Sequence, residues 1–90
     1  MILLISYDLN GHERPSAYQD VKAVIEQNAT DSIKALYSQW FVQTNESPDV
    51  WSERIKTVAD ASDRWFVCEV RRPCQGWLNK DVWEWLDARV

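Results

Sequence analysis

The sequence predicts a single α+β domain over residues 1–90, in which a layer of strands packs against helices. Its 90 residues are enough for one domain and one modest core. Apolar residues make up 46% of the chain, and there are only two glycines and three prolines, a composition typical of a globular protein. Short apolar runs alternate along the chain with amphipathic stretches, which indicates strands that alternate with helices.

The chain opens with a strand and a helix. Residues 2–9 are almost continuously apolar over a short length, which predicts a central strand. A loop over residues 10–15 follows. Residues 16–28 then carry an apolar stripe of helical period, and the spacing of Ser16 and Gln19 is that of a capping box at the helix start.

The middle of the chain predicts extended structure and a second helix. Residues 32–44 are rich in β-branched and aromatic side chains, as strands are. The segment is long for one strand, so we expect a break near Ser38 that divides it into two. The next helix begins at Pro48, because Ser47 can cap it and proline suits the first helical position.

A third pair of elements completes the domain. Residues 64–71 alternate as a strand, which Pro73 ends because proline cannot donate to the ladder. Residues 80–89 predict a terminal helix capped by Asn79. The resulting order predicts a ferredoxin-like βαββαβ sandwich with an extra C-terminal helix.

Charge and hydropathy narrow the classes of partner. The chain has 10 Lys and Arg against 14 Asp and Glu, a net charge of −4, so it favours a basic protein partner over a phosphate backbone. The longest apolar run, residues 1–5, is too short for a membrane span or a signal peptide, so we expect no membrane contact and a cytoplasmic location. Cys68 and Cys74 do not form a C-x-x-C motif, and we expect free thiols.

Six tryptophans are unusual in a chain of this length. Three fall on stripes that we expect to be buried, namely Trp40, Trp51 and Trp85. Three others are harder to bury in one core, namely Trp65, Trp77 and Trp83. Because the cores of protein interfaces are enriched in tryptophan, the second set predicts a homodimer.

Three segments carry a family resemblance. They are Ile5–Leu9, Leu36–Val42 and Asp63–Val67, and they follow one another at similar spacing within roughly residues 1–72. In these segments the chain resembles the superfamily of small CRISPR-associated endoribonucleases and virulence-associated protein D toxins. The resemblance implies a ferredoxin-like fold, a homodimer and cleavage of RNA.

The resemblance also implies a set of site residues. Asp8 matches the acidic residue that ends the first strand, faces its symmetry mate and holds a divalent metal such as Mg²⁺. Ser38 matches the serine of the second strand. Arg14 stands where many relatives carry a basic residue, which would steady the scissile phosphate. The chain departs from the family in its acidic charge and in residues 76–90, which predict a helix where relatives add a strand.

Two functions therefore stay open. The first is a metal-dependent endoribonuclease of toxin or CRISPR-associated type that acts as a homodimer. The second is a non-catalytic dimeric protein-interaction module with the same fold, in which Asp8 only bonds to amides of the following loop. His12 suits proton transfer or is a solvated loop residue, and together with Cys68 and Cys74 it makes too poor a set for a zinc site.

Overall fold

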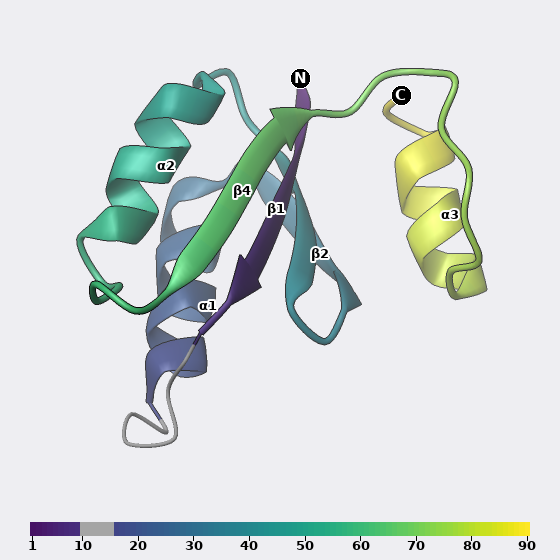
Figure 1. Ribbon diagram of the computed structural model, residues 1–90. Coiled ribbons are helices and arrows are strands. Elements are labelled where there is room, and N and C mark those ends of the chain that lie inside the picture. The colour runs from purple at the N-terminus through teal and green to yellow at the C-terminus, as the bar shows by residue number, and fades with distance from the viewer. Residues whose placement is uncertain (10–15) are drawn as a thin grey trace.

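The computed structural model describes residues 1–9 and 16–90 of the chain. The elements follow in the order β1 (Ile2–Asp8), α1 (Ala17–Asn28), β2 (Asp31–Leu36), β3 (Gln39–Gln43), α2 (Pro48–Lys56), β4 (Arg64–Glu69) and α3 (Lys80–Asp87), as Figure 1 shows. The strands form one antiparallel sheet in the order β2-β3-β1-β4. This order confirms the ferredoxin-like α+β fold with an extra C-terminal helix.

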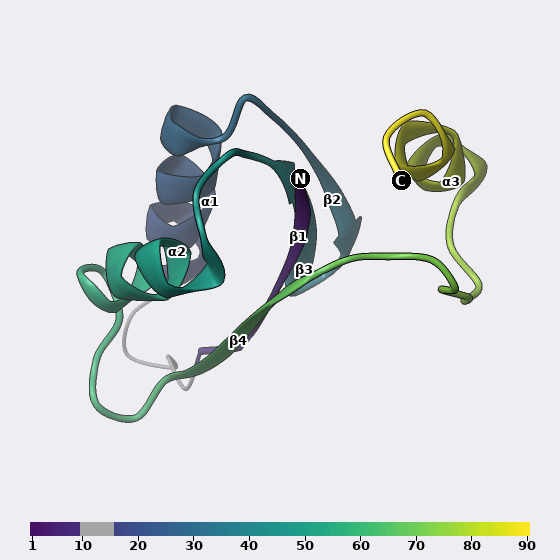
Figure 2. The same cartoon turned by 90° about the horizontal axis from the view of Figure 1, so that it is seen from above.

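Among the described residues, helices lie on both faces of the sheet, two on one face and one on the other. Helices α1 and α2 cover one face, and α3 lies on the opposite side (Figure 2). The alternation of side chains along β1 explains this arrangement. Leu3, Ile5 and Tyr7 belong to the core beneath α1 and α2, whereas Ile2 and Leu4 pack in a second cluster with α3.

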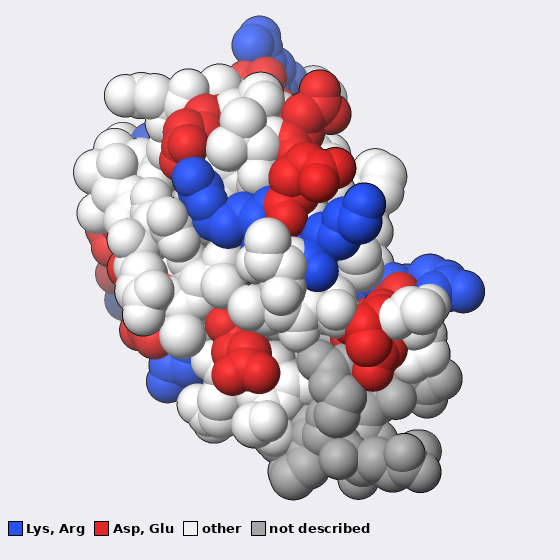
Figure 3. All heavy atoms as spheres, turned by 90° about the vertical axis from the view of Figure 1, so that its left-hand side faces the viewer, with Lys and Arg blue, Asp and Glu red and all other residues white. Residues whose placement is uncertain are grey.

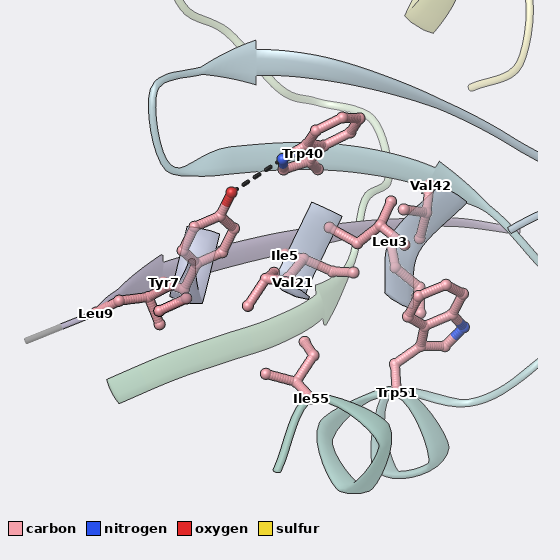
Figure 4. Packing of buried hydrophobic residues seen from close by; sticks show 11 residues of the cluster. Leu3, Ile5, Tyr7, Leu9, Val21, Trp40, Val42, Trp51 and Ile55 are labelled. Carbon is pink, nitrogen blue, oxygen red and sulfur yellow. Dashed lines mark hydrogen bonds between the residues drawn. The ribbon is translucent and has the colours of Figure 1, made fainter. Parts of the chain in front are cut away.

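The main core lies between the sheet and the first two helices (Figure 4). Trp51 and Ile55 of α2 are fully buried there, and the indole Nε1 of Trp51 donates a hydrogen bond of 3.2 Å to the hydroxyl of Thr44. Trp40 of β3 is buried in the same cluster. The predicted burial of Trp40 and Trp51 is therefore confirmed.

The second core attaches α3 to the other face. Val82 and Leu86 are each 2% exposed and pack against Ile2 and Phe41 of the sheet. The apolar stripe of residues 80–89 therefore covers apolar side chains on the face of the sheet that α1 and α2 do not reach.

Polar contacts from α3 to the start of β2 add to that attachment. The carboxylate of Asp31 accepts hydrogen bonds from Trp85 Nε1 at 3.2 Å and from Arg89 Nη2 at 2.7 Å. The backbone amide of Ser32, then the Trp85 indole and the Arg89 guanidinium, lower the pKa of Asp31. Trp85 is only partly buried, not fully as predicted, because its ring edge reaches this rim.

Details of the element ends differ from prediction. Ser47 caps α2 as expected, since its hydroxyl accepts from the Val50 amide at 3.4 Å. Ser16 and Asn79 stand at the N-cap positions of α1 and α3, but neither makes a side-chain cap bond, so the predicted capping hydrogen bonds are wrong. Their backbone carbonyls accept the first helical hydrogen bonds, from the amides of Asp20 and Trp83. The expected break near Ser38 is confirmed, because a turn there joins β2 to β3.

Candidate functional site

Asp8 is the last residue of β1, and its position follows from the alternation of that strand. It lies on the face opposite α1 and α2, at the end of β1 that is distant from the contacts of Ile2 with α3. Asp8 is exposed, as are Arg64 and Phe66 beside it on β4. We call this region, made by Asp8, Arg64 and Phe66, the exposed corner of the sheet.

The exposed corner contains a shallow hollow of about 380 Å³. Besides the three corner residues, its lining includes Ser6 of β1 and Ser38 of the β2–β3 turn. The structure therefore brings together two of the residues that the resemblance singled out, Asp8 and Ser38. Arg14 and His12 lie outside the described residues.

One backbone and one side-chain hydrogen bond hold the turn at Ser38 near the end of β1. The carbonyl of Ser38 accepts a hydrogen bond of 3.1 Å from the amide of Tyr7. One residue on, Gln39 Nε2 donates to the hydroxyl of Ser6 at 3.3 Å. The hairpin turn is thus tied to β1 next to Asp8, which places Ser38 among the residues that line the hollow.

Arg64 is a member of the site that the sequence patterns missed. The antiparallel register of β1 and β4 pairs it directly with Asp8. Its Nη1 donates to the carbonyls of Asp63 at 2.9 Å and Ala61 at 3.2 Å, which orients the guanidinium at the start of β4. An arginine in this position could contact a phosphate that approaches Asp8.

The exposed corner offers a divalent metal one carboxylate per chain, that of Asp8. Within residues 1–9 and 16–90, no three or more His, Cys, Asp or Glu side chains cluster where a metal ion could be held. Mg²⁺ is usually bound through one or two carboxylates together with water and substrate phosphates. Asp8 fits Mg²⁺ by its chemistry, and a second copy of the chain would supply the second carboxylate.

Exposed apolar side chains lie at the corner and beside α3, on the same side of the sheet. Phe66 is 65% exposed, Leu36 is 48% exposed and Trp77 is 99% exposed. Leu36 and Trp77 also line an apolar cavity of about 360 Å³ between the sheet, α3 and the segment that precedes α3. Such a concentration of exposed apolar side chains is typical of an interaction surface.

The three tryptophans that we expected to be hard to bury behave differently from one another. Trp65 packs against the main core, and its Nε1 donates to the hydroxyl of Ser52 at 2.9 Å. Trp83 packs against the second core. Trp77 alone of the three is almost fully exposed, so Trp77, Phe66 and Leu36 are the side chains that an interface on this side of the sheet would cover.

Charged side chains of both signs are interspersed on the face that carries α2 (Figure 3). Several of the arginines are already paired with carboxylates. Arg54 makes a bidentate contact with Glu46 at 3.0 and 2.8 Å, and Arg72 pairs with Asp87. A mixed surface of this kind gives weak long-range attraction for a polyanion, so binding of RNA would depend on local contacts.

Three further findings bear on function. In the part of the chain that the structure describes, none of the helices is long and apolar enough to span a membrane. Cys68 and Cys74 are free thiols, as expected. Comparison with known proteins gives no match to any protein-family model and none to a curated protein.

Proposed function

We propose that this protein is a homodimer that cleaves RNA with a divalent metal held by Asp8 from each subunit. The observation that carries the proposal is the placement of Asp8: an exposed carboxylate at the end of the central strand, in one hollow with Ser38 and Arg64. The resemblance to small endoribonucleases supports the same assignment.

A dimer would bury the exposed apolar side chains on this side of the sheet. Leu36, Phe66 and Trp77 would be covered by a second copy that packs on the same side of the sheet. A two-fold axis near the end of β1 would place Asp8 opposite its mate. Two carboxylates held close together repel each other, and a cation between them relieves that repulsion.

Each residue of the hollow then has a chemical part. When bound, Mg²⁺ would polarise the phosphate and lower the pKa of a coordinated water. The Asp8 carboxylates would hold the metal, and the Arg64 guanidinium would pair with a phosphate oxygen. The Ser38 hydroxyl would donate to a second phosphate oxygen. Arg14 keeps its predicted part as a further phosphate contact.

A non-catalytic dimeric module is the second candidate. It is favoured by the net charge of −4 and by the exposure of Trp77, which together suit a basic protein partner with an apolar centre. In this case the fold and the dimer are retained, and Asp8 has no chemical part. A cytoplasmic location is proposed for either function.

The test compares wild type with Asp8→Asn on labelled single-stranded RNA in Mg²⁺ or Mn²⁺. Glu53→Gln, an exposed acid on α2, is the matched control. We expect Asp8→Asn to lose cleavage by at least ~100-fold, the scale of a lost electrostatic contribution to a transition state, and Glu53→Gln to keep it. Equal cleavage by all three would indicate a contaminating nuclease. No cleavage by a dimeric wild type would favour the interaction module.

A further inference from the structure

A second hollow lies on the face of the sheet that α1 and α2 cover, between α1 and the β2–β3 hairpin. Its volume is about 400 Å³. Three tyrosines, two lysines and three other residues line it, namely Tyr7, Tyr18, Tyr37, Lys22, Lys34, Gln19, Glu26 and Trp40. We call it the tyrosine hollow. The proposed cleavage site does not include it, because Asp8 lies on the opposite face of the sheet.

Two buried aromatic residues joined by a hydrogen bond form the floor of the tyrosine hollow. Tyr7 is 5% exposed and Trp40 is 6% exposed, and the indole Nε1 of Trp40 donates a hydrogen bond of 3.0 Å to the hydroxyl of Tyr7 (Figure 4). Burial raises the pKa of Tyr7, so its phenol is neutral at physiological pH and keeps its proton. The Tyr7 hydroxyl therefore accepts from Trp40 and can still donate a hydrogen bond.

The rings of Tyr7, Tyr18 and Tyr37 form one side of the hollow, which we call the aromatic wall. The ring centroids of Tyr7 and Tyr18 are 5.8 Å apart, and those of Tyr18 and Tyr37 are 5.4 Å apart. These pairs are tilted by 52° and 48°, so each ring covers only part of its neighbour's face. Tyr37 is 74% exposed. Exposed aromatic rings of this kind are the platforms on which nucleic-acid bases stack.

Two lysines also line the hollow, beside the aromatic wall. Lys22 comes from α1, and Lys34 comes from β2, where its Nζ lies 5.1 Å from the Tyr37 ring centroid. Gln19, Lys22 and Glu26 share one helix face by their spacing of three and four residues. The hollow thus offers two ammonium groups for an anion, and an amide and a carboxylate that can bond to hydroxyl or amino groups.

We infer that the tyrosine hollow binds a nucleotide unit, with the base on the exposed tyrosine rings and the phosphate between Lys22 and Lys34. A planar ring joined to an anionic group matches both halves of the lining, and the Glu26 carboxylate suits an exocyclic amino group or a ribose hydroxyl. A free mononucleotide and one unit of an RNA strand share this chemistry. The inference is independent of cleavage at Asp8.

The test is a titration of ¹⁵N-labelled protein with adenosine monophosphate, adenosine and inorganic phosphate, followed by NMR at the Trp40 indole N–H. We expect the nucleotide to bind with a Kd below ~1 mM and the two fragments to bind at least ~10-fold more weakly. Tyr37→Ala and the pair Lys22→Gln with Lys34→Gln should each weaken nucleotide binding by ~10-fold or more. Lys80→Gln on α3, 91% exposed, is the matched control and should change nothing.

Two results would contradict a nucleotide site in this hollow. An indole signal that does not move with the nucleotide overturns the inference, and so does phosphate that binds as tightly as the nucleotide. Because Tyr37, Lys22 and Lys34 are exposed, the variants should keep the wild-type melting temperature, which separates lost binding from lost folding. Asp8→Asn should bind the nucleotide as wild type does, whether or not cleavage is found. Tighter binding of a short oligoadenylate than of the mononucleotide would assign the site to a strand, and equal binding to the free nucleotide.

Discussion

Replacement of Leu86 by alanine tests whether α3 is an integral layer of this fold. Leu86 is 2% exposed, and truncation of a buried leucine costs about 2–5 kcal/mol. The side chain also borders the partly open apolar cavity of about 360 Å³, so its replacement would enlarge an existing opening and would not create a sealed void. We therefore expect the lower half of that range, about 2–3 kcal/mol. A chain of 90 residues has a total stability of roughly 5–13 kcal/mol, so the loss is a large share of it.

The assay is thermal unfolding followed by circular dichroism. At about 4–8 °C per kcal/mol for a domain of this size, Leu86→Ala should lower the melting temperature by about 10–20 °C. Glu84→Ala on the exposed side of the same helix is the control and should cost less than about 0.5 kcal/mol. A melting temperature for Leu86→Ala within about 3 °C of wild type would refute the second core and make α3 a loosely attached tail.

Two other substitutions test the polar contacts. The lowered pKa of Asp31 means that its stabilising effect is complete above pH 3.8 and is lost as the pH falls below that value. Asp31→Asn should cost up to about 1 kcal/mol at pH 7, because the side chain is half-exposed, and the difference from wild type in melting temperature should shrink as the pH falls below 3.8. Trp51→Phe should cost about 2 kcal/mol in urea unfolding, because it leaves a space in the main core and removes the indole donor to Thr44; a loss under about 0.5 kcal/mol would contradict that packing.

The sheet and its helices could be predicted because their information is periodic. The apolar run of β1 and the stripes of the helices repeat over many residues, so single exceptions do not obscure them. The caps at Ser16 and Asn79 could not be predicted in the same way. Each depends on one rotamer and one hydrogen bond, and neither side chain makes that bond here. Trp85 lies less deep than its apolar stripe predicts, because its indole nitrogen donates a hydrogen bond to Asp31 at the rim of the sheet.

The candidate site was predictable only in part, for a related reason. Asp8 and Ser38 belong to local motifs, but Arg64 becomes a neighbour of Asp8 only through the register of β1 with β4. That signal is present in the sequence once antiparallel pairing is assumed. The tyrosine hollow carries no local signal, since Tyr7, Tyr18 and Tyr37 come from a strand, a helix and a turn that the fold brings together.

The stoichiometry of Mn²⁺ binding tests most directly whether Asp8 from two subunits shares one metal. Isothermal titration of the dimer, with its mass measured by light scattering, reports the number of ions per chain. We expect one Mn²⁺ per two chains, and loss of this binding in Asp8→Asn with the dimer intact. One ion per chain, or unchanged binding in Asp8→Asn, would contradict a metal held between two Asp8 carboxylates.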